Sequence, residues 1–111
     1  MAEVQILGLT VCDSCRAARK ALEAAGHAVA FRDLRKEPIG KDEILKLWQE
    51  LGPSLLNKSS TTWRGLSEDE KARDPVELLA EHPTLIKRPI VSDGAKRSLG
   101  WNAAVQKNWL G

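Results

Sequence analysis

Cysteine is scarce in this sequence, with two residues in 111, which excludes a small secreted scaffold held together by disulfides. Neither sign of charge dominates the sequence, because 17 Lys and Arg against 15 Asp and Glu give a net charge of +2. A dedicated nucleic-acid binder usually has a clustered basic face, so we expect no direct nucleic-acid binding. No apolar run approaches the roughly 20 residues that span a bilayer, so we expect no membrane contact.

The N-terminal residues show no basic leader followed by a long apolar run, so we expect a cytoplasmic protein. In a reducing compartment, a close pair of cysteines is more often catalytic, redox-sensing or metal-binding than structural. No dinucleotide fingerprint, phosphate loop or haem attachment motif is present, so no bound cofactor is expected. The length and the lack of repeats or linkers predict a single domain over residues 1–111, and we expect a monomer.

The first third of the chain has a strand–helix–strand pattern. An apolar run at 4–9 predicts a buried strand, and apolar residues at helical spacing over 13–25 predict a helix that Gly26 ends. Alternating polarity over 28–33 predicts a second strand. The short crossover between the two strands favours parallel pairing with a right-handed connection.

The middle of the chain, approximately 40–82, is predicted to be helical. An apolar stripe supports a helix over 41–51. Ser67 followed by Glu70 fits a capping box, and Asp74 has the features of the N-cap of a further helix.

Strand signals return near the C-terminus. The apolar run 89–91 predicts a strand, Asp93 followed by glycine predicts a hairpin turn, and 95–99 is the expected returning strand. A closing helix is predicted over 102–109, with Asn102 as its N-cap. The order of elements predicts an α/β protein with a thioredoxin-like fold and an inserted helical subdomain.

The strongest chemical signal is the pair Cys12 and Cys15, which follows the first predicted strand and opens the first predicted helix. Cys12 lies at or before the first helical turn, where free N–H groups and the positive end of the helix dipole favour a thiolate. Cys15 lies one turn later, close enough to attack a disulfide at Cys12. A neighbouring group adds positive charge, chiefly as a solvated helix face, and consists of Arg16, Arg19 and Lys20.

Three other interpretations of the pair can be weighed, of which two inert thiols in a small domain is the plainest. A phosphatase-type anion loop needs an arginine six residues after its cysteine, where Ala18 and Ala21 stand. A structural zinc site needs four ligands, but the only histidines are His27 and His82, and no second cysteine pair exists. Both histidines are instead expected to cap helix ends.

Three segments carry a resemblance over nearly the whole chain. They are LTVCDSCRAARKAL around Cys12, NKSSTTWRGL at 57–66, and HPTLIKRPIV at 82–91 followed by GAKRSLGWN. Together they resemble the arsenate reductase (ArsC)/Spx family of thioredoxin-like proteins. The resemblance implies a small sheet with an inserted helical domain and a reactive Cys12. It also implies that Arg88 and Pro89 face this cysteine, with Pro89 as the cis proline of the fold.

In the arsenate reductases of this family, the cysteine attacks arsenate, glutathione displaces the adduct, and glutaredoxin completes the cycle. This chemistry needs a thiolate and several guanidinium groups around the oxyanion. Arg88 matches one family arginine, whereas Asn57 stands where we align a second. The third falls near 100–101, where no arginine stands, so Arg64 or Arg97 would have to substitute. The resemblance therefore implies weak arsenate turnover.

A second cysteine at this turn is typical of Spx-type regulators, which bind the C-terminal domain of the RNA polymerase alpha subunit and switch by disulfide formation. Gly52 lies about where a glycine matters for that contact, and it fits a helix C-cap equally well. Spx proteins also carry a C-terminal extension beyond the point where this sequence ends. The small ArsC-family proteins of Gram-negative bacteria, proposed as glutathione-dependent thiol reductases, are similar in size and in the TTWR segment, and the chain fits that branch best.

We therefore expect a thiol–disulfide oxidoreductase that resembles the glutathione- and glutaredoxin-dependent arsenate reductases. The expected catalytic residues are Cys12 as nucleophile, Cys15 as resolving thiol and Arg88 as an anion contact. The expected substrate contacts are Asn57, Arg64 and Pro89. Glutathione is the expected co-substrate, with glutaredoxin or thioredoxin as partner. The alternative is a redox-sensing regulator that binds the RNA polymerase alpha subunit.

Overall fold

A computed structural model describes residues 3–110. The chain divides into two compact units, of which the first combines Met1–Glu37 with Arg88–Gly111 and the second is Pro38–Lys87. The second unit contains the segment that the sequence predicts to be a helical insertion. Within residues 3–110, no helix is long and apolar enough to cross a membrane.

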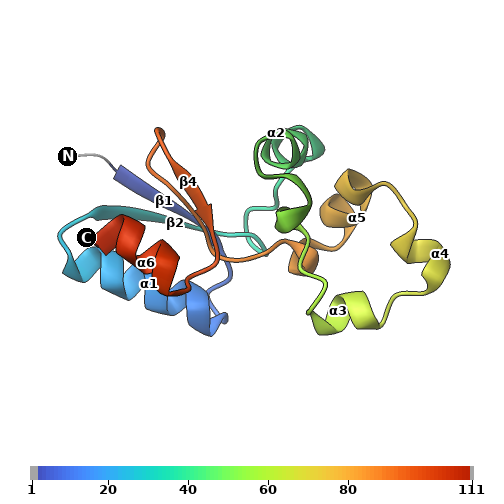
Figure 1. Cartoon of the computed structure of the whole chain (residues 1–111), viewed down its shortest axis with the longest axis horizontal. Helices are drawn as coiled ribbons and strands as arrows, with labels where there is room; N and C mark the ends of the chain where they lie inside the picture. The colour runs from blue at the N-terminus through green and yellow to red at the C-terminus, as the bar shows by residue number, and fades with distance from the viewer. Residues whose placement is uncertain (1–2, 111) are drawn as a thin grey trace. The chain divides into compact units, whose positions relative to one another are not determined.

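The first unit is built on a four-stranded sheet with the order β2-β1-β3-β4 (Figure 1). Strands β1 and β2 run parallel, as the strand–helix–strand pattern predicts, whereas β1 with β3 and β3 with β4 are antiparallel. Helices α1 and α6 lie side by side in this unit. The elements are β1 (Glu3–Gly8), α1 (Asp13–Ala24), β2 (Ala28–Asp33), β3 (Ile90–Ser92), β4 (Arg97–Leu99) and α6 (Ala103–Leu110).

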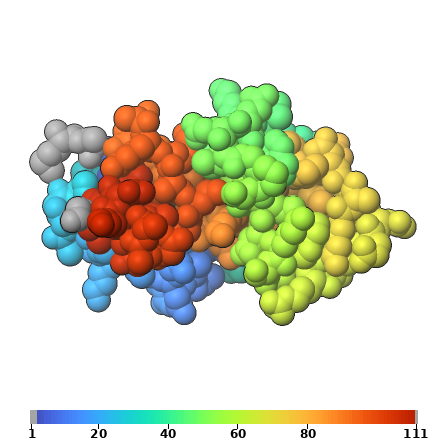
Figure 2. Space-filling view, viewed as in Figure 1, coloured from blue at the N-terminus to red at the C-terminus, as the bar shows by residue number. Residues whose placement is uncertain are grey.

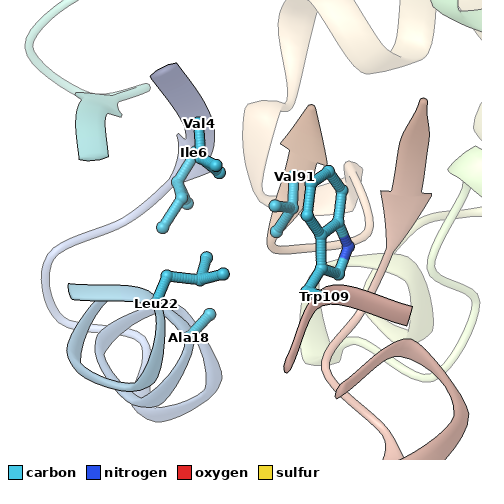
Figure 3. Packing of buried hydrophobic residues seen from close by; sticks show 6 residues of the cluster. All are labelled: Val4, Ile6, Ala18, Leu22, Val91 and Trp109. Carbon is cyan, nitrogen blue, oxygen red and sulfur yellow. The ribbon is translucent and has the colours of Figure 1, made fainter. Parts of the chain in front are cut away.

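The core of the first unit joins the sheet to both helices (Figure 3). It consists of Val4 and Ile6 from β1, Ala18 and Leu22 from α1, Val91 from β3 and Trp109 from α6. Trp109 also donates its indole N–H to Ser98 Oγ at 2.8 Å, so its one polar atom is satisfied although the side chain is only 6 % exposed. Full burial of a side chain such as Leu22 contributes about 1.5–3 kcal/mol, so this cluster fixes α1 and α6 against the sheet.

Helix α6 lies at the surface of the first unit on the face drawn in Figure 2, where it is coloured red. The helix turns Trp109 inward, while Lys107 and Asn108 remain exposed. Asn102 Oδ1 accepts a hydrogen bond from Val105 N at 2.9 Å, which confirms the predicted N-cap. Strand β4 is shorter than the predicted 95–99 because the carboxylate of Asp93 holds the first residues of that range in the turn.

The second unit is helical, and the residues predicted to cap its helices bond to backbone N–H groups only two or three residues away. Ser67 Oγ accepts from Glu70 N at 3.2 Å and Asp74 Oδ1 accepts from Val76 N at 2.9 Å, which confirms both predicted N-caps. The Glu70 carboxylate pairs with Arg73. The elements are α2 (Lys41–Leu51), the 3-10 helix η1 (Gly52–Leu55), α3 (Thr61–Arg64), α4 (Glu68–Lys71), α5 (Pro75–Glu81) and the 3-10 helix η2 (Pro83–Leu85).

Buried side chains of α2 and α5, with residues of the two 3-10 segments, make up the interior of the second unit. They include Ile44, Leu47, Leu55, Leu78, Leu79, Leu85 and Ile86. A single antiparallel bridge joins Leu56 to Ile86. Gly52 ends α2 with a φ of +69°, a left-handed value that favours glycine. The backbone therefore accounts for Gly52 as a C-cap, one of the two interpretations that the sequence allows.

Candidate active site at the start of α1

Cys12 occupies the last position of a tight turn that leads from β1 into α1. Its backbone N–H donates to the Leu9 carbonyl at 3.0 Å, which closes the 9–12 turn. Its own carbonyl accepts from Arg16 N at 3.0 Å and so begins the helix, which makes Cys12 the N-cap of α1. The sulfur therefore lies among the N–H groups that the first helical turn leaves without intrahelical partners, as the sequence predicts.

The surroundings of Cys12 favour its thiolate. Partial burial by itself would raise the pKa of this thiol, but hydrogen bonding with the backbone and the thiol of Cys15 lowers it. The Arg88 guanidinium donates a further hydrogen bond and contributes its positive charge. These contacts outweigh the burial, so the pKa of Cys12 lies below its ordinary value. A lowered pKa favours the reactive form of Cys12 over the interpretation of two inert thiols.

Cys15 lies in the opposite environment. Its side chain is 0 % exposed, and burial raises the pKa of the Cys15 thiol to about 12. A hydrogen bond from Leu9 N and the charge of Arg88 oppose this shift only in part, whereas the neighbouring Cys12 adds to it. Both cysteines are free in the structure. At neutral pH, Cys15 is therefore a protonated thiol that donates to the Cys12 sulfur.

Gly8, the last residue of β1, leaves the space that the Cys15 sulfur occupies. A Cβ atom added at Gly8 would overlap Cys15 Sγ and lie 3.2 Å from Cys15 Cβ. Sequence reasoning treated Gly8 only as a strand residue. No signal in the sequence identifies its role, because the requirement arises from the position of a side chain seven residues away.

Arg88 and Pro89 lie immediately before β3, and the peptide bond between them is cis, as the sequence resemblance implies. Pro89 is buried, and its carbonyl accepts from Gly100 N at 2.9 Å. Arg88 is half-buried, and its guanidinium lowers the pKa of Cys12. The structure therefore brings Cys12, Cys15 and Arg88 together within the first unit.

The arginines of α1 contribute little to this site. Arg16 pairs with Asp13, and both side chains are largely exposed. Arg19 lies 3.7 Å from the Glu23 carboxylate and also stacks over the Phe31 ring. These pairs support the prediction that this group is chiefly a solvated helix face. The guanidinium that acts on Cys12 is that of Arg88.

Asp33, at the end of β2, is a component of the site that sequence reasoning missed. It is only 9 % exposed, and its carboxylate accepts hydrogen bonds from Thr10 N at 3.2 Å, Thr10 Oγ1 at 2.8 Å and Arg35 N at 2.8 Å. The Arg35 N–H and the Thr10 hydroxyl lower the pKa of Asp33 to about 2. The signal that could have found it is an acidic residue at the end of a parallel strand, because Asp33 pairs in register with Gly8 beside the cysteine turn.

Asn57 and Arg64 belong to the second unit. Asn57 Oδ1 accepts from Ser59 N at 3.1 Å, and Asn57 N donates to the Leu85 carbonyl at 2.8 Å. Arg64 is exposed and donates to the Ser59 carbonyl at 2.8 Å. These contacts give both residues a place in the local turn structure, and their roles as substrate contacts stay predictions. Arg97, the other substitute considered, is exposed on β4 of the first unit.

A known protein family matches most of the chain. The model of the ArsC family covers residues 7–108, which include both cysteines, Arg88 and Pro89. The chain belongs to the ArsC family. The mixed α/β architecture with a four-stranded sheet is the thioredoxin-like fold that the sequence predicts.

Individual relatives of this ArsC-family chain are similar over most of their length. The uncharacterized protein YusI of Bacillus subtilis is 33 % identical over 107 residues, covering 88 % of this chain and 91 % of the relative. The global transcriptional regulator Spx of the same species is 32 % identical over 99 residues, covering 82 % and 74 %. Among solved structures, the YFFB protein has a TM-score of 0.88 and 27 % identity, covering 97 % of this chain and 99 % of its own.

Proposed function

We propose that this ArsC-family protein is a glutathione-dependent thiol–disulfide oxidoreductase in which Cys12 is the nucleophile. The observation that carries the proposal is the environment of the Cys12 sulfur. This sulfur lies at the N-cap of α1, where Cys15 and the positively charged Arg88 guanidinium lower the pKa of Cys12. A lowered pKa increases the fraction of thiolate at neutral pH, and the thiolate is the form that attacks a disulfide.

In the proposed reaction, the Cys12 thiolate attacks one sulfur of a mixed disulfide between glutathione and a second thiol. A Cys12–glutathione disulfide forms, and the other sulfur leaves as a thiolate that takes a proton from water. A second glutathione thiolate then attacks the glutathione sulfur of this intermediate. Glutathione disulfide leaves and the Cys12 thiolate is restored, so the net reaction converts one mixed disulfide and one free glutathione into one free thiol and one glutathione disulfide.

Cys15 offers a second route for the resolving step. Its sulfur would attack Cys12 Sγ, expel glutathione as a thiolate and leave a Cys12–Cys15 disulfide for glutaredoxin or thioredoxin to reduce. This attack requires removal of the Cys15 proton, and a thiol with a pKa of about 12 loses its proton reluctantly at neutral pH. We therefore propose that glutathione resolves the intermediate and that Cys15 mainly stabilises the Cys12 thiolate.

Arsenate is a poorer candidate substrate than a disulfide. An arsenate adduct on Cys12 needs several guanidinium groups to neutralise the oxyanion. Within the described residues of the first unit, the guanidinium that acts on Cys12 is Arg88. One guanidinium suits a thiolate and a glutathione carboxylate, whereas a dianionic oxyanion needs more.

The test is NADPH consumption with glutathione, glutathione reductase and hydroxyethyl disulfide as the substrate, and with arsenate plus glutaredoxin in parallel. We expect Cys12→Ser to abolish turnover of the disulfide and Cys15→Ser to retain most of it. Arg88→Gln should raise the pKa of Cys12 and lower turnover about tenfold, which corresponds to one charge-assisted hydrogen bond. Arg16→Gln is the matched control, because it removes an exposed arginine of α1 that pairs with Asp13. Full turnover by Cys12→Ser would overturn the proposal.

A redox-sensing regulator is the second candidate function. It is favoured by the identity of 32 % with Spx and by the adjacency of Cys12 and Cys15, which a disulfide could join. In this case the partner would be the C-terminal domain of the RNA polymerase alpha subunit. A pull-down with that domain, using the reduced and the oxidised protein, separates the candidates. Binding that depends on the redox state and is lost in Gly52→Arg would support the regulator, and no binding in either state would exclude it.

A further inference from the structure

Asp33 joins the end of β2 to the turn that presents the reactive cysteine, although the two lie far apart in the sequence. Its carboxylate accepts both the backbone N–H and the hydroxyl of Thr10, which stands 23 residues earlier. Leu34 N donates to the Gly8 carbonyl at 2.9 Å and so ties the residue after Asp33 to the end of β1. The start of the cysteine turn is therefore held from the neighbouring strand.

Thr10 is a central residue of the 9–12 turn, which the hydrogen bond from Cys12 N to the Leu9 carbonyl closes. Central residues of a turn set its backbone direction, so the position of Thr10 determines where Cys12 enters α1. Val11, the other central residue, is 62 % exposed and has no comparable anchor among the contacts described. The Asp33 carboxylate therefore anchors this turn from outside through two hydrogen bonds to Thr10.

We propose that Asp33 is a positioning residue for the Cys12 thiolate, because it fixes Thr10 and thereby places the Cys12 sulfur against the N–H group of Cys15 and the Arg88 guanidinium. The inference rests on the proposed role of Cys12 as nucleophile. Asp33 itself does not touch the sulfur or a substrate in this scheme. It acts through Thr10 and the backbone of the 9–12 turn.

Electrostatics and positioning predict opposite results when the charge of Asp33 is removed. A carboxylate near a thiolate disfavours the thiolate, so its loss by charge alone would lower the pKa of Cys12. Asn in its place has one acceptor oxygen for donors that now use two oxygens, so at least one hydrogen bond to Thr10 or Arg35 is lost. If positioning dominates, Asp33→Asn therefore raises the pKa of Cys12 in spite of the lost negative charge.

The test measures the Cys12 thiol directly, by the thiolate absorbance near 240 nm and by the rate of iodoacetamide alkylation as a function of pH. These readouts are made with the full chain and do not require turnover. We expect Asp33→Asn to lower the alkylation rate at pH 7 about threefold to tenfold, the range that one hydrogen bond provides. An unchanged or lowered pKa of Cys12 in a folded Asp33→Asn protein would overturn the inference.

Asp93 offers a matched control for Asp33. Its carboxylate also holds a turn, accepting from Ala95 N at 2.9 Å and Lys96 N at 2.8 Å, and these hydrogen bonds also lower its pKa. This turn joins β3 to β4, and the β3 residue before it pairs with Gln5, far along β1 from the cysteine turn. Asp93→Asn should therefore leave the titration of Cys12 unchanged, and an equal shift in both variants would mean that Asp33 has no special role.

Variants of Thr10 keep the inference testable if Asp33→Asn fails to fold, which circular dichroism would reveal. Thr10→Val keeps the backbone hydrogen bond and loses the one at Oγ1, so the Cys12 pKa should rise by less than in Asp33→Asn. Thr10→Ser restores the hydroxyl and should recover most of the alkylation rate, and an equal loss in both Thr10 variants would contradict the inference. If Cys12→Ser retains turnover while Asp33→Asn still raises the Cys12 pKa, the proposed function fails and the positioning role stands.

Discussion

The first unit contains two cysteines in contrasting surroundings, which shift the pKa of the thiol in opposite directions. At the start of α1, hydrogen-bond donors and the Arg88 guanidinium lower the pKa of Cys12. One helical turn further on, against Gly8, burial raises the pKa of Cys15 to about 12. The spacing of a cysteine pair therefore determines how close the two sulfurs lie, whereas the surroundings of each sulfur determine its reactivity.

The largest difference between the two regions should be seen in alkylation of the native protein at pH 7. A thiol with a pKa of about 12 is thiolate to only about one part in a hundred thousand at this pH, and Cys15 is also inaccessible. We expect iodoacetamide to modify Cys12 at least about a hundredfold faster than Cys15.

Peptide mass spectrometry after timed quenching gives both rates in one sample. The Cys12→Ser and Cys15→Ser variants assign each rate to its sulfur. Alkylation in urea gives the rates of both thiols in the unfolded chain. Equal rates in the native protein would mean that the contrast between the two environments is wrong.

The second expected effect comes from the contact between Gly8 and Cys15. Gly8→Ala places a methyl group where the Cys15 sulfur lies, and overpacking of this kind costs about 1–3 kcal/mol in the free energy of unfolding. Gly65→Ala is the control, because a Cβ there meets only ordinary contacts, the nearer at 3.5 Å to the Thr61 carbonyl. It should change the free energy of unfolding by less than about 1 kcal/mol.

A double-mutant cycle tests whether the cost of Gly8→Ala depends on the Cys15 sulfur. Cys15→Ala removes the sulfur, so adding Gly8→Ala to it should cost far less than adding Gly8→Ala to the original chain. Urea unfolding of the four proteins gives the coupling free energy. Additive effects would show that Gly8 is needed for another reason than the Cys15 sulfur.

Sequence reasoning succeeded where the signals are local. The strand–helix–strand opening, the caps at Ser67, Asp74 and Asn102, and the position of Cys12 at a helix start each depend on a few neighbouring residues. The placement of Arg88 beside Cys12 was different, because it came from the family resemblance and not from spacing. In the structure, the Arg88 guanidinium lowers the pKa of Cys12.

Gly8, Thr10 and Asp33 were missed because their roles depend on the fold. The carboxylate of Asp33 meets Thr10 only when β1 and β2 pair in parallel with Gly8 opposite Asp33. Sequence reasoning predicted this pairing but not its register, and a shift by one residue would turn Asp33 to the other face of the sheet. A prediction of the site therefore needs the register as well as the strands.

A further expected effect is the dependence of stability on alkaline pH, which the raised pKa of Cys15 determines. Below pH 9, the thiol is protonated in the folded and the unfolded chain, and its contribution to stability is fully present. Between pH 9 and about 12, the unfolded chain loses this proton while the folded chain keeps it, so stability falls by up to about 1.4 kcal/mol per pH unit.

Cys15→Ala isolates this contribution, because every other titrating group is present in both proteins. The difference in unfolding free energy between the original chain and the variant should be constant from pH 6 to 8 and should shrink from pH 9 to 10.5. Urea unfolding at these pH values, with Cys12→Ser in both proteins to prevent oxidation, measures it. A constant difference throughout would mean that Cys15 ionises as easily in the folded chain as in the unfolded one, and the two regions around the cysteines would then be electrostatically alike.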